Sequence, residues 1–242
     1  LNEHLEENKR LIKDHQELYN NIYLAKEKND YDKKVEELNE KKNNIGDTVK
    51  ELKISFVGDS VMLGAVRELG KMFPNSYSDA LTSRSLIAGI GVIEDLKNAG
   101  NLADIVVVNL GANGDCYNGC KDKVMDIVGK DRNVFWLTVT DDYKVNINSK
   151  LKELAEKYEN FHVIDWESLS EGHEDWFYAD GIHLPYTGQK AYTEVIYNAL
   201  VDFYKDKFSL IREKELKEFA LSQLNGLEMY GNDLLINVFD LI

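Results

Sequence analysis

A serine, an aspartate and a histidine stand in a pattern that could carry out acyl transfer. Ser60 follows the short apolar run 54–57 and Gly58, and it lies at the expected start of a helix. There its hydroxyl could act as a nucleophile, with its backbone N–H and the helix dipole facing a developing oxyanion. A serine at a helix start is also a common N-cap, so the position alone leaves both roles open.

Asp180 and His183 could supply the partners that a serine nucleophile needs. A free hydroxyl is a weak nucleophile, so it needs a base, and the base needs a carboxylate to orient it. An Asp three residues before a His, with Gly181 between them, can place both side chains on one turn. One ring nitrogen would then bind the carboxylate while the other reaches Ser60. The spacing is common in sequences, so a solvated surface turn is the alternative.

A third loop, 109–114, follows the β-branched run 105–108. Gly111 and Gly114 would let the backbone approach a ligand closely, and the Asn113 amide could donate to an oxyanion. An ordinary glycine-rich turn capped by Asn is the alternative. The sequence lacks the fingerprint Gly-x-Gly-x-x-Gly, which argues against a dinucleotide-binding loop.

The elements that must position these loops alternate between strands and helices. The predicted strands are 54–57, 105–108, 134–137 and 161–164, and the predicted helices are about 61–72, 86–99, 119–129, 143–158 and 187–205. This alternation predicts a three-layer α/β/α fold with a mainly parallel sheet and right-handed crossovers. Ligands of such sheets lie at the carboxyl ends of the strands, where the three loops would meet.

The segments on either side of this domain differ from it. Residues 1–50 carry apolar positions at helical spacing, with a polar interruption at 29–30, and predict either a coiled-coil stalk or a helix packed on its own domain. The catalytic domain is expected to span 51–205. Residues 206–242 predict a helical extension whose end, 234–242, is apolar. Such an end should pack against the rest of the chain or serve self-association.

The composition narrows the class of protein. The chain has 242 residues, 43% of them hydrophobic, and a formal net charge of −14. That charge would repel a phosphate backbone, so nucleic acid is not an expected partner. No apolar run approaches the length of a membrane span, and no signal peptide is expected in this chain.

Together, in this order and strand context, the three loops resemble the SGNH (GDSL-type) hydrolase superfamily over about 53–200. The segments 58–62, 109–114 and 176–183 also resemble the extracytoplasmic domain of bacterial peptidoglycan O-acetyltransferases. In that family the domain follows an integral-membrane acyltransferase module and moves acetyl to the C6 hydroxyl of N-acetylmuramic acid. The resemblance implies an acetyl donor, a glycan acceptor, no cofactor, and a place at the extracellular face of the bacterial cytoplasmic membrane.

Carried over by motif, the resemblance makes Ser60 the expected nucleophile, His183 the base and Asp180 its orienter. The expected donors of the oxyanion hole are Ser60, Ser83 and Asn113, with Gly89 as the alternative to Ser83. The expected substrate contacts are Asp59, Arg84, Gly111, Trp176 and Tyr178. Trp176 and Tyr178 could stack on a sugar ring or could instead pack beneath the Asp180 loop.

One segment departs from the pattern of the family. Typical members carry an Arg and a Trp after the 134–137 strand, where this chain has Thr140-Asp141-Asp142-Tyr143. An acidic pair at this place disfavours anionic glycans, so the surface that binds the acceptor is expected to differ.

Cys116 and Cys120 lie close to Asn113 in the sequence. Two thiols without clustered histidines make a poor metal site, so no metal is expected. A disulfide that closes the loop would suit an exported protein, and free buried thiols are the alternative. His162, inside an apolar run, is expected to be structural.

Two rival functions remain on the sequence alone. The same acyl-serine would make the protein a carbohydrate or lipid acyl-esterase if water accepts the acyl group instead of a sugar hydroxyl. A non-catalytic surface-binding module would keep the fold while losing the three triad residues, all of which are present here.

Overall fold

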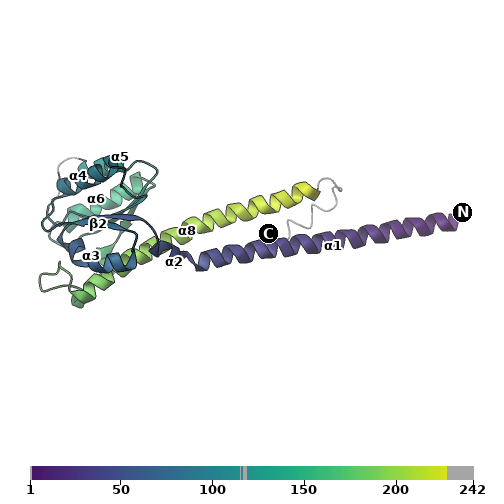
Figure 1. Cartoon of the computed structure of the whole chain (residues 1–242), viewed down its shortest axis with the longest axis horizontal. Coiled ribbons are helices and arrows are strands. Elements are labelled where there is room, and N and C mark those ends of the chain that lie inside the picture. The colour runs from purple at the N-terminus through teal and green to yellow at the C-terminus, as the bar shows by residue number, and fades with distance from the viewer. Residues whose placement is uncertain (1, 115, 117–118, 228–242) are drawn as a thin grey trace. The chain divides into compact units, whose positions relative to one another are not determined.

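The chain divides into an α/β unit, Gly46–Phe203, and a helical unit whose described residues are 2–45 and 204–227 (Figure 1). The structure is a computed structural model that describes residues 2–114, 116 and 119–227. None of the helices in this part of the chain is long and apolar enough to cross a membrane.

A five-stranded parallel sheet forms the centre of the α/β unit. The strands are β1 (Ile54–Gly58), β2 (Tyr77–Ala80), β3 (Ile105–Asn109), β4 (Asn133–Leu137) and β5 (Phe161–Ile164), in the spatial order β2-β1-β3-β4-β5. Gly58 pairs with Asn109 on one side and with Ala80 on the other, so the loops after three strands leave from the same edge. The predicted α/β fold with a parallel sheet is confirmed, and β2 is a strand that the sequence did not predict.

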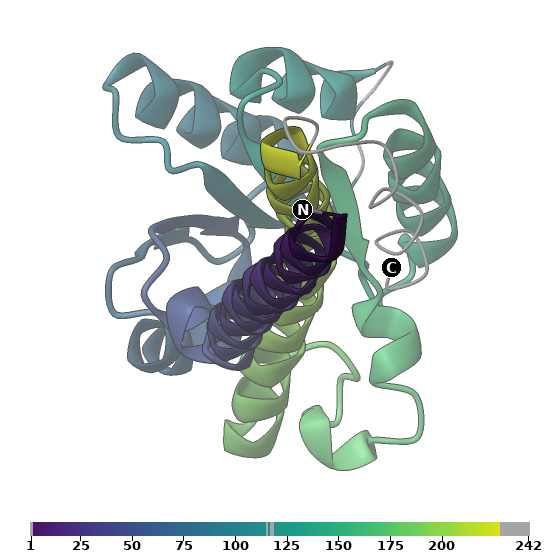
Figure 2. The same ribbon diagram turned by 90° about the vertical axis from the view of Figure 1, so that its right-hand side faces the viewer.

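Helices cover both faces of the sheet (Figures 1 and 2). The elements of this unit, besides the strands, are α2 (Ile45–Lys50), α3 (Ser60–Met72), α4 (Leu86–Asn98), α5 (Cys120–Val128), α6 (Lys144–Lys157), α7 (Trp166–Leu169), the 3₁₀ turn η1 (Glu174–Trp176) and the first part of α8 (Tyr186–Leu227). Helices α4, α5 and α6 lie on one face, and α3 lies on the other together with the start of α8. Side chains that alternate along each strand therefore enter two separate cores.

The core under α4, α5 and α6 is wholly apolar at its centre. Val57 and Trp136 from the sheet pack there with Ile90 of α4 and Ile147 of α6, and each of these side chains is buried. The indole N–H of Trp136 is satisfied because it donates to the carbonyl of Leu110 at 3.2 Å.

His162 belongs to the opposite core. Its ring centroid lies 4.6 Å from that of Phe135 and 4.8 Å from that of Phe203, and its Nε2 is 3.0 Å from Asn133 Oδ1. Burial lowers the pKa of this histidine, which favours the neutral ring. His162 thus packs among aromatic side chains, in keeping with a structural role.

The helical unit pairs α1 (Asn2–Asn43) with the last part of α8. The rings of Tyr31 and Phe219 are 6.3 Å apart between centroids, and Lys34 Nζ lies 3.4 Å from Glu215 Oε2. The polar positions 29–30 lie within α1 and do not interrupt the helix. Self-association through this helix stays a prediction, and the apolar end 234–242 lies outside the described residues.

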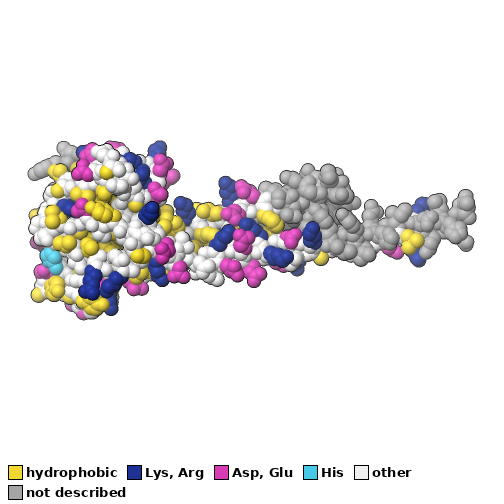
Figure 3. All heavy atoms as spheres, in the orientation of Figure 1, with side chains coloured by type: hydrophobic (Ala, Val, Ile, Leu, Met, Phe, Trp, Pro, Cys, Tyr) yellow, Lys and Arg dark blue, Asp and Glu magenta, His cyan; other side chains and the backbone are white. Residues whose placement is uncertain are grey.

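Acidic and basic side chains are interspersed over the face of the α/β unit seen in Figure 3. The net charge of −14 is therefore not gathered into one acidic patch on this face. Hydrophobic side chains also lie between the charged ones on the same surface.

Gly188, in the first turn of α8, marks a close approach of two backbone segments. A Cβ atom here would lie 1.8 Å from the carbonyl oxygen of Trp176. Gly188→Ala should therefore lower the melting temperature sharply, although Ala in a helix interior is normally more stable than Gly by about 1 kcal/mol. The matched control is Gly91→Ala in α4, where nothing lies within 4 Å of the added methyl group and the melting temperature should rise. Similar shifts for the two variants would contradict this packing.

Candidate active site

Ser60 is the first residue of α3, directly after β1, and it is not the residue that caps the helix. Asp59 is the N-cap, because its Oδ1 accepts the N–H of Val61 at 3.0 Å. A Cβ on Gly58 would lie 2.4 Å from the Cβ of Met62, so only glycine fits the tight turn between strand and helix. The hydroxyl of Ser60 is thus left available for chemistry.

Ser60, His183 and Asp180, which the sequence predicted to form a triad, lie in one hydrogen-bonded chain. His183 Nε2 is 3.0 Å from Ser60 Oγ, and His183 Nδ1 is 2.9 Å from Asp180 Oδ2. The other carboxylate oxygen of Asp180 accepts the backbone N–H groups of Ile182 and His183, each at 2.9 Å. These hydrogen bonds lower the pKa of Asp180 to about 2, so it is ionised at neutral pH.

The turn that carries Asp180 and His183 is closed by the backbone. Tyr178 N–H donates to the carbonyl of His183 at 2.8 Å, and Gly181 N–H donates to the carbonyl of Tyr178 at 2.9 Å. Gly181 has a φ of 69°, which glycine adopts without strain. Thr140 Oγ donates to the Gly181 carbonyl at 3.3 Å, which ties this turn to the loop after β4.

Ser83 occupies the corner of a turn beside the end of β1. Leu81 N–H donates to the carbonyl of Gly58 at 3.2 Å, and Arg84 N–H closes the turn on the Leu81 carbonyl at 3.2 Å. Ser83 itself has a φ of 55°, an uncommon value for a residue with a side chain. Within the described residues, neither the Ser83 N–H nor the Ser60 N–H has a hydrogen-bond acceptor. Both donors are therefore free to bind an oxyanion.

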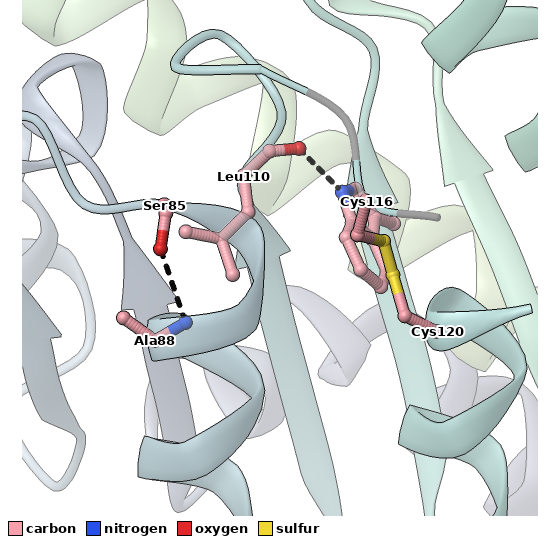
Figure 4. Close-up of a disulfide and its surroundings, with 6 residues drawn as sticks. Ser85, Ala88, Leu110, Cys116 and Cys120 are labelled. Carbon is pink, nitrogen blue, oxygen red and sulfur yellow. Dashed lines mark hydrogen bonds between the residues drawn. A yellow bond between two sulfur atoms is a disulfide. The ribbon is translucent and has the colours of Figure 1, made fainter. Parts of the chain in front are cut away.

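Gly89, the alternative to Ser83, does not have a free N–H. It donates to the carbonyl of Ser85 at 3.0 Å, at the first turn of α4. A Cβ on Gly89 would lie 2.2 Å from Leu110 Cδ1, so packing explains this glycine. Figure 4 shows Leu110 between the Ser85–Ala88 turn and the neighbouring disulfide.

Asn113 is exposed and is held by Asp59. Its Nδ2 donates to Asp59 Oδ2 at 3.3 Å, and its second N–H has no acceptor among the residues that the structure describes. Asp59 is fully buried, so it holds Asn113 and caps α3 instead of lying where a substrate could touch it. Burial is the main reason that the pKa of Asp59 is raised to about 6; the N–H of Val61 opposes this rise, and the charge of Asp141 adds to it.

Besides Asp59, two more of the expected substrate contacts, Arg84 and Gly111, are buried in the structure. Arg84 is 8% exposed, pairs with Asp79 and donates to the Gly58 carbonyl at 3.1 Å. Gly111 packs close to Ile147, 3.0 Å from the position that its Cβ would take. Both residues pack inside the loops, whereas the sequence suggested that they contact the substrate.

The two expected aromatic contacts differ in exposure. Trp176 is stacked between Trp166 and His173, at 5.6 and 3.8 Å between ring centroids, so much of its surface is used in packing. Tyr178 is 58% exposed and could meet a ligand.

A disulfide joins Cys116 and Cys120, at the start of α5 (Figure 4). It borders a polar cavity of about 430 Å³ that is also lined by residues of α5 and α6, including Asn146, Ser149 and Glu153. Among residues 2–114, 116 and 119–227, no group of three or more His, Cys, Asp or Glu side chains is arranged to hold a metal.

Comparison with known proteins finds relatives for the central part of the chain. No family model matches it. Over 142 residues, or 58% of the chain, it is 36% identical to the O-acetyltransferase OatA of Staphylococcus aureus. The chain is homologous to OatA. It spans 24% of the length of that relative, so the match concerns one part of OatA only.

Solved structures match the same fold. The C-terminal catalytic domain of Streptococcus pneumoniae peptidoglycan O-acetyltransferase A (OatA) superposes with a TM-score of 0.53 at 20% identity, over 62% of this chain and 92% of that one. A family 3 carbohydrate esterase from Clostridium thermocellum gives 0.50 at 16% identity, over 63% and 96%. The SGNH-type fold that the motifs predicted is thereby confirmed.

The buried carboxylate of Asp59 should make stability depend on pH. Its pKa is about 6 in the folded state and 3.8 in the reference state, so the folded protein binds this proton more tightly. The free energy of unfolding of the wild type should therefore fall, relative to Asp59→Asn, as pH rises from about 4 to about 7. The upper bound of this change is on the order of 3 kcal/mol.

Urea unfolding of both proteins at the two pH values measures this difference. Asn is a good N-cap, so the variant keeps the start of α3. The matched control is Asp142→Asn, which changes an exposed carboxylate nearby and should show no such trend. A constant difference between wild type and Asp59→Asn across this range would contradict the buried charge.

Proposed function

We propose that this chain is a serine-dependent O-acetyltransferase domain, which moves an acetyl group through an acyl-serine to a cell-wall glycan, at the C6 hydroxyl of a muramyl residue. The observation that carries the proposal is the hydrogen-bonded chain from Ser60 through His183 to Asp180. The 36% identity to OatA of Staphylococcus aureus favours an O-acetyltransferase among the activities that such a chain can perform.

In the first half-reaction, Ser60 Oγ attacks the carbonyl carbon of an acetyl ester while His183 Nε2 takes the hydroxyl proton. Asp180 holds the other nitrogen of the ring and stabilises the imidazolium. The oxyanion binds the free N–H groups of Ser60 and Ser83 and the second N–H of the Asn113 amide. His183 then gives its proton to the departing alcohol, which leaves an acetyl-serine.

In the second half-reaction, the acceptor hydroxyl attacks the acetyl-serine. Its proton passes to His183, the oxyanion forms at the same donors, and the bond between the acetyl carbon and Ser60 Oγ breaks. Ser60 Oγ recovers a proton from His183, so the site returns to its starting state. The residues of this chain therefore suffice for both steps without a cofactor.

By the same likeness to the family, the acetyl donor would come from a membrane acyltransferase module that precedes the domain. The domain would then act at the extracellular face of the bacterial cytoplasmic membrane. Nothing in the two half-reactions requires a nucleic-acid partner.

Hydrolysis is the second candidate, because the site is open to water. The side chains of His183 and Asp180 are 46% and 47% exposed, so water can reach the acetyl-serine. An activated acetyl ester, supplied with and without muramyl oligosaccharides, separates the two reactions by mass spectrometry. Transfer predicts faster release of the leaving group with the sugar present and an acetylated sugar as product. Unchanged release, with free acetate as the only product, would make the chain an esterase.

Ser60→Ala should abolish acyl turnover, a loss of orders of magnitude, while the protein stays folded. The contrasting variant is Ser85→Ala, because Ser85 is a true N-cap whose Oγ accepts the N–H of Ala88 at 3.3 Å. That change should cost about 1 kcal/mol of stability and leave turnover in place. A methylsulfonyl adduct is present in the structure of the pneumococcal domain, and methanesulfonyl fluoride should label Ser60 here. Turnover by folded Ser60→Ala would refute the proposal.

Asp180→Asn should lower kcat by about a thousandfold or more. The Asn oxygen can still accept the N–H groups of Ile182 and His183, so the turn should remain. Its NH₂ would face His183 Nδ1 and force the proton onto Nε2, which then cannot accept the proton of Ser60. Asp175→Asn, an exposed carboxylate nearby, should leave kcat near the wild-type value. A modest effect of Asp180→Asn, with the melting temperature unchanged, would argue against the triad.

A further inference from the structure

Asp141 carries a carboxylate oxygen that lacks a partner. The residue follows β4 and is 8% exposed. Its Oδ1 accepts the N–H of Tyr143 at 2.7 Å, whereas its Oδ2 is buried and has no hydrogen-bond donor in the part of the chain that the structure describes. A buried polar atom without a partner is unfavourable, so a hydrogen-bond donor placed at this oxygen would be stabilising.

Asp141 lies beside the proposed active site. Parallel strands place the loop after β4 at the same edge of the sheet as Ser60, and Thr140 joins this loop to the Gly181 carbonyl. The charge of Asp141 also acts on Asp59, the residue before Ser60. A group bound at Asp141 would therefore be near the reacting serine.

The charge around Asp141 is not compensated. In the described residues, no Lys or Arg forms an ion pair with Asp59, Asp141 or the exposed Asp142. Lys144, on the next helix, is paired with Glu167 at 3.0 Å. This region therefore attracts a cation and repels an anion.

We propose that Asp141 selects the acceptor, by accepting a hydrogen bond from the ammonium group of an amino sugar in which the usual acetamide is a free amine. This inference rests on the proposed acetyl transfer to a glycan. An ammonium has donors only, so it satisfies Oδ2 and neutralises the local charge together. An acetamide offers one neutral N–H, and a free carboxylate offers none. Tyr143, which is 50% exposed, lies two residues away and could pack on the sugar ring.

The ammonium takes no part in the bond changes. The acceptor hydroxyl still forms the new ester with the acetyl carbon, and its proton still leaves through His183 to Ser60. Asp141 is thus a specificity group that binds the acceptor, distinct from the residues that move protons.

The test compares two matched acceptors, chitosan and chitin oligosaccharides of equal length, with an activated acetyl ester as donor. O-acetylated product is counted by mass spectrometry as the alkali-labile fraction, so that N-acetylation is not scored. The wild type should transfer faster to the amino sugar. Asp141→Asn should lower kcat/KM for that acceptor roughly tenfold to a hundredfold, mainly through KM, the range expected for a hydrogen bond to a charged group. The acetamido acceptor should lose much less.

The controls separate selection from charge and from folding. Asp142→Asn removes the same charge from an exposed neighbour and should leave the preference for the amino sugar in place. Asp141→Asn retains an oxygen for the Tyr143 N–H, and Asp141→Ser, which retains a hydroxyl acceptor, is the second variant if the first does not fold. An equal loss for both acceptors, or the same loss in Asp142→Asn, would overturn the inference.

The same experiment keeps the two proposals apart. If wild-type protein releases no leaving group from the activated ester, and Ser60→Ala behaves identically, the proposed function fails. If wild-type protein transfers acetyl groups but shows no preference for the amino sugar, only the role of Asp141 fails.

Discussion

The hydrogen bond between His183 Nε2 and Ser60 Oγ joins residues that are 123 positions apart in the sequence, and the α/β unit is arranged so that this bond can form. A parallel sheet brings the carboxyl ends of all its strands to one edge, which no local segment could do alone. Gly58 turns the chain from β1 into α3 at that edge. Asp180 then fixes the imidazole ring through a turn of its own, so both ends of the bond are set by backbone geometry.

A second constraint is the buried carboxylate of Asp59, next to Ser60, because burial disfavours its ionised form. The same carboxylate caps α3 and holds Asn113, although it is fully buried and its pKa rises to about 6. An apolar residue would be less costly to bury, and an exposed residue would carry no cost of burial. Either one would leave the Asn113 amide without a fixed partner. Retaining a buried charge for the sake of geometry is typical of functional sites, where stability yields to positioning.

Much of this was readable from the sequence, and the failures have physical causes. Four strands followed from apolar runs, and the order of the motifs pointed to Ser60, Asp180 and His183, which the structure brings into one hydrogen-bonded chain. The edge strand β2 was missed because Tyr77–Ala80 has no apolar run, and its strand pairing comes from β1 instead of from its own side chains. A helix was predicted for residues 1–50, and α1 continues through positions 29–30, where only the apolar stripe is interrupted, because polar residues on a helix surface cost little propensity. The burial of Asp59 and Asp141 depends on packing between distant loops, which no local pattern reports.

Ser60, His183 and Asp180 would determine the chemistry, whereas the loop after β4 would determine which acceptor binds. This separation explains how the acceptor could change on one scaffold. Asp141 is held by its own turn, in which its side chain binds the Tyr143 N–H and its carbonyl accepts the Lys144 N–H at 3.1 Å. In the part of the chain that the structure describes, the hydrogen bond from Thr140 to the Gly181 carbonyl joins this turn to the turn of Asp180 and His183. Since Ser60 and His183 take their positions from other elements, residues at 141–143 can vary without moving either of these two side chains. A site assembled from separate loops on a rigid sheet can therefore keep its chemistry while its acceptor changes.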